Sequence, residues 1–215
     1  MQGNFGQGNQ HSFRAVFVNV PDGFKTNYSG YLPIQNVQEA MTDKRPSITD
    51  SGPTLRLREA TAADRPRLIP LINSAFSIET FLEGTRTDDE RLADTMKTGT
   101  ILVAESLAEE EGSARLLACV SIEIRGPRGY LGQLAVDPAH QGKGLGRIMI
   151  EAAEERFRLE GCEAVDITVL SMRPDLPPLY RRFGYMETGV VEGFRPIRRL
   201  APGVECHGIK MSKRL

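Results

Sequence analysis

Glycine occupies every second position in the segment 141–146 (Gln-Gly-Lys-Gly-Leu-Gly), directly before apolar residues at helical spacing. Glycine carries no Cβ atom, so a ligand can approach its backbone closely. The first N–H groups of a helix have no intrahelical partner, and the helix dipole places about half a positive charge beside them. The segment therefore predicts a site for a phosphate or pyrophosphate group at a helix N-terminus.

The spacing of these glycines excludes two nucleotide-binding motifs. A P-loop needs Gly-Lys followed by Ser or Thr, and neither follows Lys143. The dinucleotide fingerprint needs Gly-x-Gly-x-x-Gly directly after a strand. Here the run is Gly-x-Gly-x-Gly, and it follows a loop that begins at Asp137 and Pro138. An oxidoreductase with a nucleotide cofactor is therefore not predicted.

The segment matches the (Gln/Arg)-x-x-Gly-x-(Gly/Ala) signature of the GNAT superfamily, the acetyl-CoA-dependent N-acetyltransferases, with Gln141, Gly144 and Gly146 at the named positions. Residues 134–138 (Leu-Ala-Val-Asp-Pro) resemble the strand and bend that this family has before the signature. Residues 178–185 resemble its later Leu-Tyr-x-x-x-Gly-Phe/Tyr motif. The resemblance covers about residues 54–215, and it implies direct acetyl transfer from acetyl-CoA to a primary amine in a ternary complex.

The resemblance also implies which residues bind the cosubstrate acetyl-CoA. They belong to one strand, the glycine segment and the start of the following helix: Leu134, Ala135, Val136, Gln141, Gly142, Lys143, Gly144, Leu145, Gly146 and Arg147. One usual contact to the pantetheine arm has no counterpart, because relatives often have Asn seven residues before the motif tyrosine and this chain has Arg173. No metal site is predicted.

Acetyl transfer to an amine requires that the amine lose a proton and that the departing thiolate gain one. A lysine-type amine has a pKa near 10.4, so its neutral form lies roughly 4.6 kcal/mol uphill at pH 7. The resemblance implies that Tyr180 is the catalytic residue that donates a proton to the sulfur. The alternative is that Tyr180 only packs beside Leu179 and Phe183.

The residue that accepts the amine proton is harder to predict, because the positions at which relatives carry Glu or His are Tyr130 and Gly132. A hairpin with Pro127 and Arg128 at its tip would place Glu123 opposite Gly132, so Glu123 is the candidate base. Two alternatives stay open: Glu123 is a salt-bridged or solvated strand residue and water is the base, or the chain is a non-catalytic coenzyme A-binding sensor.

These groups must be positioned by an α/β domain. Helical patterns cover residues 61–76, 87–97, 144–160 and 175–183, and two of them begin with a capping pattern. Strand patterns cover residues 54–58, 101–105, 116–125, 130–136, 164–170, 186–194 and 205–212. The family resemblance implies a mixed central sheet of six to seven strands, splayed between the fourth and fifth strands, with about four helices.

Residues 1–53 differ in composition and are predicted to be an extension or linker before a domain of residues 54–215. Gly, Asn and Gln crowd its first ten positions, and a strand is predicted within residues 13–20. Aromatic residues are frequent in it, which favours a poorly ordered extension that partly docks, with a second copy of the chain in a homodimer as the candidate partner. Nothing in it suggests chemistry.

The charge balance and the cysteines limit the partners and the compartment. Lys plus Arg number 27 against 28 Asp plus Glu, so no overall field predicts binding to nucleic acid or an anionic membrane. The three cysteines show no metal spacing and no nucleophile setting, which favours buried thiols and argues against an acetyl-enzyme. No segment resembles a signal peptide or a membrane span, so a cytoplasmic protein is predicted.

Overall fold

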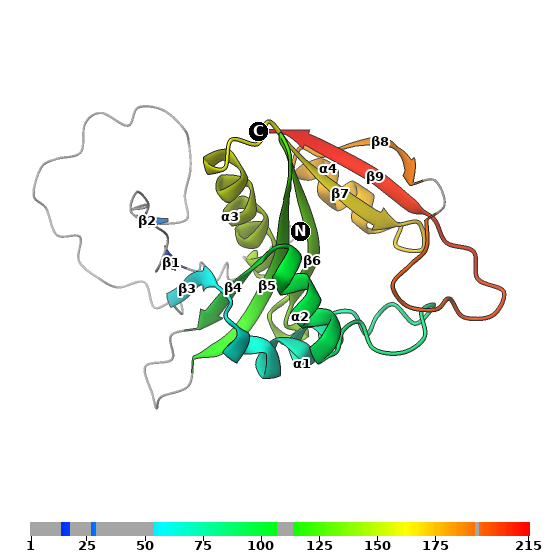
Figure 1. Ribbon diagram of the computed structural model, residues 1–215, viewed down its shortest axis with the longest axis horizontal. Coiled ribbons are helices and arrows are strands. Elements are labelled where there is room, and N and C mark those ends of the chain that lie inside the picture. The colour runs from blue at the N-terminus through cyan, green and yellow to red at the C-terminus, as the bar shows by residue number, and fades with distance from the viewer. Residues whose placement is uncertain (1–13, 18–26, 29–53, 107–113, 192–193) are drawn as a thin grey trace, which may run out of the picture.

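The computed structural model describes residues 14–17, 27–28, 54–106, 114–191 and 194–215, and within them the chain forms one mixed sheet with helices on both faces (Figure 1). The strands are β1 (Arg14–Phe17), β2 (Asn27–Tyr28), β3 (Thr54–Glu59), β4 (Thr100–Ser106), β5 (Arg115–Arg125), β6 (Arg128–Val136), β7 (Ala164–Leu170), β8 (Met186–Val191) and β9 (Gly208–Arg214). The helices are η1 (Ala62–Asp64), α1 (Arg65–Ala75), α2 (Asp89–Thr98), η2 (Pro138–His140), α3 (Leu145–Leu159) and α4 (Leu176–Arg182), of which η1 and η2 are 3₁₀ helices.

The strands of the sheet follow the order β2-β1-β3-β4-β5-β6-β7-β9-β8. β6 and β7 are parallel, and they pair only from Arg128 with Ala164 to Tyr130 with Asp166. Beyond these pairs the two strands diverge (Figure 1). β3 to β9 are the seven strands described after residue 53, so the predicted splay between the fourth and fifth strands of the domain is confirmed, as are four α-helices.

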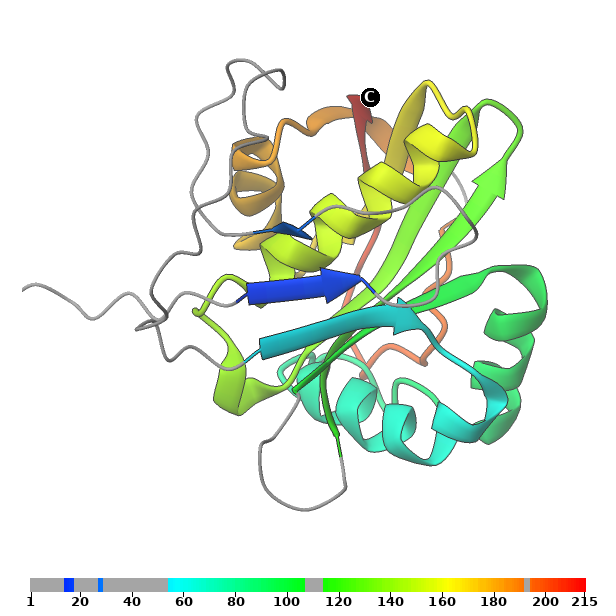
Figure 2. The same cartoon turned by 90° about the vertical axis from the view of Figure 1, so that its left-hand side faces the viewer.

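Alternate side chains of the central strands enter two separate cores, one on each face of the sheet. On β5, Val120 packs in the core under α3, whereas Cys119 packs in the core under α1 and α2. Figure 2 shows α3 on one side of the sheet and these two helices on the other. Gly129 of β6 lets α3 approach closely, because a Cβ atom there would lie 2.3 Å from the buried Phe157 ring. α3 is therefore held firmly along the strand that precedes the glycine segment.

The boundaries of several elements differ from those predicted. α2 is capped by the side chain of Asp88, which accepts a hydrogen bond from the Arg91 N–H, and not by Thr87. Thr87 is instead buried, where its backbone exchanges two hydrogen bonds with the Asn73 side chain. β8 ends at Val191 and β9 begins only at Gly208.

The described part of the extension adds two short strands to the edge of the sheet. β1 pairs in parallel with β3, and β2 pairs with β1 in antiparallel fashion. The strand predicted within residues 13–20 is thus confirmed over Arg14–Phe17. Other residues of the 1–53 segment lie outside the described part of the chain, and its boundary at residue 53 stays a prediction. No helix in the described part is long and apolar enough to cross a lipid bilayer.

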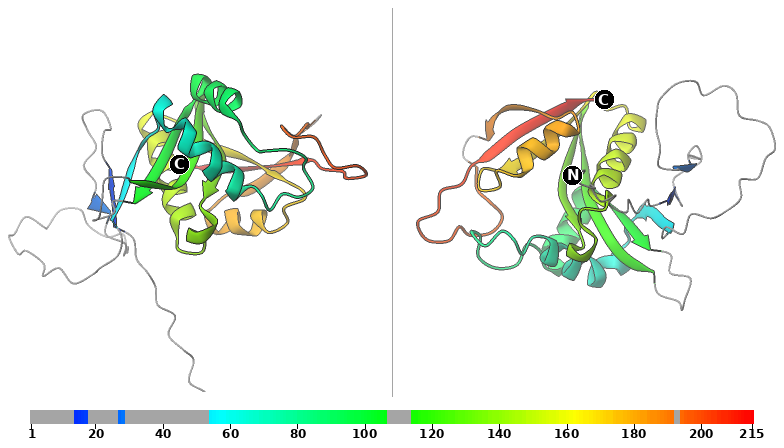
Figure 3. Two further views of the ribbon diagram at one scale, coloured as in Figure 1. Left: turned by 90° about the horizontal axis from the view of Figure 1, so that it is seen from below. Right: turned by 180° about the vertical axis from the view of Figure 1, so that it is seen from behind.

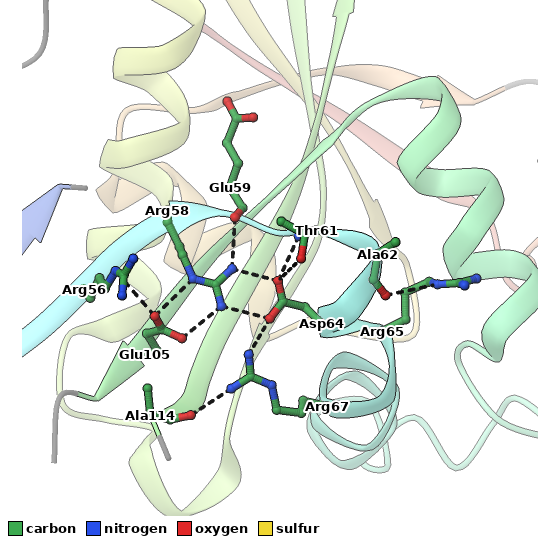
Figure 4. Close-up of polar contacts among 10 residues, drawn as sticks. All are labelled: Arg56, Arg58, Glu59, Thr61, Ala62, Asp64, Arg65, Arg67, Glu105 and Ala114. Carbon is green, nitrogen blue, oxygen red and sulfur yellow. Dashed lines mark hydrogen bonds and ion pairs between the residues drawn. The ribbon is translucent and has the colours of Figure 1, made fainter. Parts of the chain in front are cut away.

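A buried ion-pair network joins β3 to β4 and to the start of α1 (Figure 4). Arg58 donates hydrogen bonds to both carboxylate oxygens of Asp64 at 2.7 and 2.8 Å, and to both of Glu105 at 3.0 Å. These two acidic residues are only 2% and 3% exposed. Asp64 also accepts a hydrogen bond from the Thr61 N–H at 2.8 Å, which confirms the predicted capping pattern.

Candidate active site

The β5–β6 hairpin turns one residue earlier than predicted. Arg125 pairs with Arg128, so the tip is formed by Gly126 and Pro127, and the predicted tip at Pro127 and Arg128 is wrong. Gly126 has a φ of 61°, a conformation that glycine adopts more readily than other residues, and it takes the first position of the turn for that reason. From Ser121 to Arg125, each β5 residue therefore faces a β6 residue two positions earlier than expected.

Glu123 consequently lies opposite Tyr130, not opposite Gly132. Its carboxylate accepts a hydrogen bond from Arg125 at 2.7 Å, and its side chain is 38% exposed. This hydrogen bond lowers the pKa of Glu123. A carboxylate with a lowered pKa is a weaker base, so the contact favours the reading of Glu123 as a salt-bridged strand residue.

β6 carries a bulge where it separates from β7. Gln133 has a φ of 44°, and the ladder to β5 shifts register between Cys119 and Ser121, so β6 has one extra residue there. Beyond Tyr130, no described strand pairs with the β7-facing edge of β6. The backbone groups of Leu134 and its neighbours on that edge are therefore available to an extended ligand.

The glycine segment forms the turn that opens α3. Gly142 and Gly144 have φ values of 75° and 85°, and a Cβ atom added to either would meet nothing within 4 Å. Gly144 is the N-cap, and the first α-helical bond runs from the Ile148 N–H to its carbonyl at 3.1 Å. The first backbone N–H groups of α3, among them that of Gly146, thus lie before the helical ladder begins.

Side chains of the same segment hold the turn in place. The Gln141 amide donates to the Val136 carbonyl at 3.1 Å, and the Lys143 ammonium donates to the Ala139 carbonyl at 3.2 Å. Leu145 is buried in the core beside α3. These contacts tie the loop to the end of β6, so the segment that carries the predicted cosubstrate residues is held in place from strand to helix.

Tyr180 lies on α4, on the arm of the sheet formed by β7, β9 and β8 (Figure 3, right). The residue is 8% exposed, and its ring packs edge-on against Tyr185 with centroids 5.7 Å apart. Burial raises the pKa of Tyr180 to about 12, the positive charge of Arg173 opposes this shift, and Tyr130 adds to it. The phenol therefore keeps its proton at neutral pH and lies within electrostatic range of both Arg173 and Tyr130.

A family model described as the acetyltransferase (GNAT) family matches residues 67–185, which is more than half of the chain. The chain belongs to the GNAT family. The matched range begins in α1 and ends directly after α4, so it contains the glycine turn, the splay and Tyr180.

Individual relatives of the chain match shorter stretches. The mycothiol acetyltransferase of Propionibacterium freudenreichii subsp. shermanii is 33% identical over 72 residues, which are 34% of this chain and 23% of that protein. A protein of Oryza sativa subsp. japonica, named probable glucosamine 6-phosphate N-acetyltransferase 2, is 32% identical over 95 residues, 42% of this chain and 55% of the relative. The chain thus spans about a quarter and about half of these two proteins.

A solved structure with the same fold is the PaiA N-acetyltransferase of Thermoplasma acidophilum in complex with coenzyme A. It superposes with a TM-score of 0.57 at 13% identity, and the match covers 75% of this chain and 99% of that chain. At 13% identity, this superposition shows only that the two proteins share a fold.

Acetyl-CoA is the cosubstrate of this GNAT protein, and the described residues fit it. Open space beside Gly142 and Gly144 at the N-terminus of α3 suits a pyrophosphate, and the edge of β6 that no described strand pairs with suits an extended arm. Ala135 can contribute only its backbone, because its side chain is buried in the core under α1. Cys119 is also buried there, and burial raises the pKa of its thiol to about 12, so it is no acyl carrier.

Sequence reasoning did not join three charged residues of this chain that the two loops bring together. They are Glu79, Arg86 and Arg198, from the loops at residues 77–87 and 195–201. No motif marked a residue in the first loop. Glu79 and Arg198 are 119 residues apart in the sequence, so no local pattern could have joined them.

Proposed function

We propose that this chain is an N-acetyltransferase that moves the acetyl group of acetyl-CoA to a primary amine of a small molecule or peptide by direct transfer in a ternary complex. The observation that carries the proposal is the glycine turn at the N-terminus of α3, which continues the unpaired edge of β6 at the splay. The buried phenol of Tyr180 supports it, because that side chain lies on the other arm of the splay.

In the proposed reaction, the amine nitrogen bonds to the acetyl carbon, the carbon–sulfur bond breaks, and the amine proton finally resides on the thiol. An ordinary thiol has a pKa near 8.5, so complete proton transfer from a phenol with a pKa of about 12 would cost roughly 5 kcal/mol. Tyr180 is therefore best suited to stabilise the thiolate through a hydrogen bond as it forms. If Tyr180 gives its proton to the sulfur, the phenol must at the same time regain the proton that the amine loses.

We propose that water is the first acceptor of the amine proton, because the Glu123 carboxylate accepts a hydrogen bond from Arg125. We expect Glu123→Gln to keep the kcat and the pH profile of the unaltered protein. A general base contributes roughly 10²- to 10⁴-fold, so a drop of about a hundredfold would return the role to Glu123. Arg125→Gln is the control, because it breaks the same ion pair and leaves the carboxylate in place.

Gly144→Glu is expected to abolish the rise in melting temperature that acetyl-CoA causes. The added carboxylate would occupy the phosphate position with a like charge, whereas binding at about a hundred times Kd stabilises the unaltered protein by roughly 2.7 kcal/mol. Thermal unfolding with and without acetyl-CoA measures the effect.

The matched control for this variant is Gly161→Glu, at the other end of α3. Gly161 has a φ of 76°, and open space surrounds its Cβ position, so this change brings the same charge and similar backbone strain. It should lower the melting temperature of the free protein and keep the acetyl-CoA shift. If Gly144→Glu kept the full rise in melting temperature with acetyl-CoA, the cosubstrate site would have to lie elsewhere in the protein.

Acetyl-CoA turnover over a panel of amines tests the activity itself. Release of free thiol that depends on the added amine, together with the acetylated amine in the product mixture, is the expected result. Acetyl-CoA binding without turnover on any amine would instead support a non-catalytic coenzyme A-binding sensor.

A further inference from the structure

The loops at residues 77–87 and 195–201 lie side by side, at the end of the sheet where β6 and β7 diverge (Figures 1 and 3). An antiparallel bridge joins Leu82 to Leu200. The Glu83 N–H donates to the Arg199 carbonyl at 2.8 Å, and the Ala201 N–H donates to the Phe81 carbonyl at 3.0 Å. The two loops thus form one connected wall beside the splay.

A buried carboxylate on this wall is shared between arginines. Glu79 is 3% exposed, and one of its oxygens accepts a hydrogen bond from Arg198, which is 6% exposed. Its other oxygen lies 3.8 Å from Arg173, the residue that stands where relatives often carry Asn. Arg173 also donates two hydrogen bonds to the exposed Asp175, at 3.0 and 2.8 Å.

A third arginine of the wall, Arg86, has no ion pair or hydrogen bond to any described residue. Its guanidinium stacks over the Phe76 ring, 4.6 Å from the centroid. The Nε atoms of Arg86 and Arg198 are buried and have no hydrogen-bond partner in the described chain. Burial lowers the pKa of Arg86, and the positive charge of Arg198 lowers it further, although Glu79 opposes this.

The arginine cluster, defined as Arg86, Arg173 and Arg198, therefore holds an excess of positive charge. Glu79 supplies its one fully buried negative charge among the described residues, and Asp175 is largely solvated. A buried cation without a counter-ion is costly, and its N–H groups lose their hydrogen bonds to water. An anionic ligand would satisfy both requirements at once.

The cluster lies next to the proposed reaction centre. The charge of Arg173 acts on Tyr180, and Tyr130 interacts electrostatically with both Tyr180 and Arg86. An amine beside the Tyr180 hydroxyl would thus have the cluster close by. The glycine turn lies on a different segment and already offers its own N–H groups for the phosphates of acetyl-CoA.

We propose that the acceptor carries a carboxylate or phosphate group in addition to its amine, and that the arginine cluster, with Arg86 as its unpaired member, binds this anion. The inference rests on the proposed acetyl transfer. A planar guanidinium presents two parallel N–H groups that match the oxygens of either anion. Acceptor specificity would then arise from the loop wall, whereas acetyl-CoA binding arises from β6 and α3.

Matched pairs of acceptors test the proposal in the full-length protein. α-Amino acids are compared with their carboxamides, and amino sugar phosphates with the unphosphorylated amino sugars. We expect kcat/KM to be roughly ten- to a hundredfold higher for the anionic member of at least one pair. The pair that shows the difference identifies the anion as carboxylate or phosphate. Equal kcat/KM in every pair would overturn the inference and leave acetyl transfer standing.

Arg86→Gln removes the unpaired charge and keeps polar N–H groups on a shorter side chain. We expect it to raise KM for the preferred anionic acceptor roughly ten- to a hundredfold and to bring kcat/KM down to the level of the neutral analogue. The control is Arg199→Gln on the same wall, because the Arg199 side chain is 82% exposed and lies 3.8 Å from Glu83. The control should behave like the unaltered protein with both acceptors.

Two binding measurements separate the possible failures. If Arg86→Gln weakens the thermal shift by acetyl-CoA and leaves the discrimination between acceptors intact, the cluster binds the cosubstrate and the inference is wrong. Calorimetry on the coenzyme A-bound protein follows the same acceptor pairs without turnover. If the unaltered protein binds the anionic member and Arg86→Gln does not, the result supports the anion site even when no amine is acetylated. Equal binding of both members would overturn the inference.

Discussion

Tyr180→Phe is expected to lower kcat at least tenfold, and by up to about 10⁴-fold, since a positioned proton donor contributes roughly 10²- to 10⁴-fold. Only the hydroxyl is lost, and the ring keeps its edge-on contact with Tyr185, so the affinity for acetyl-CoA should stay nearly unchanged. Steady-state kinetics with a saturating amine, together with the acetyl-CoA thermal shift, measure the two quantities separately.

Tyr185→Phe is the control, because it removes the hydroxyl from the other ring of the same pair. Tyr185 is fully buried, packs in the core beneath α3 and should not affect kcat. A rate equal to that of the unaltered protein in Tyr180→Phe would mean that Tyr180 only packs, and the sulfur would then have to obtain its proton from water.

The pH profile gives a second test of the same assignment. Burial raises the pKa of Tyr180 to about 12, so the phenol stays protonated over the range in which the acceptor amine loses its proton. kcat/KM should therefore rise with pH until the pKa of the amine and show no decline from Tyr180 below about pH 11. A decline near neutral pH would indicate another acid.

The glycine turn was predictable because its signals are local. Pro138 ends the strand, alternating glycines permit the turn, and the apolar spacing from Leu145 defines the buried face of α3. The capping pattern at Thr61 was visible for the same reason. Elements whose geometry depends on neighbours in sequence were thus placed to within a few residues.

Features that depend on distant segments were not predictable. The hairpin register depended on which of two adjacent dipeptides formed the tip, and the bulge at Gln133 was missed although Gly132, a glycine inside the strand, stands directly before it. The arginine cluster needs two loops that meet only in the folded chain. Arg58 is a similar case, because its two acidic partners lie 6 and 47 residues away in the sequence.

Arg58→Ala is expected to lower the free energy of unfolding by about 3–5 kcal/mol. The variant would leave the carboxylates of Asp64 and Glu105 buried without the guanidinium that they share. Domains are stable by roughly 5–15 kcal/mol, so the loss is a large fraction of the total. Urea unfolding at about pH 7 measures it, provided that the transition is reversible.

Arg56→Ala on the same strand is the matched control. The side chain of Arg56 is 34% exposed and lies 3.6 Å from Glu105, so its ion pair should contribute less than about 1 kcal/mol. A triple variant with Arg58→Met, Asp64→Asn and Glu105→Gln removes all three charges together. It should be more stable than Arg58→Ala, because no buried charge is left without a partner.

Lowering the pH should reduce the difference in the free energy of unfolding between Arg58→Ala and the unaltered protein. The hydrogen bond from Arg58 is the largest cause that lowers the pKa of Asp64, so the unfolded chain binds a proton at higher pH than the folded one. The stability that this carboxylate supplies is complete above the unfolded pKa of about 3.9 and is lost as the pH falls toward the folded value. Without Arg58 the folded pKa rises, so the variant has less of this stability to lose between about pH 5 and pH 3. A difference that stayed constant over this range would assign the effect to lost packing of the Arg58 alkyl chain and not to charge.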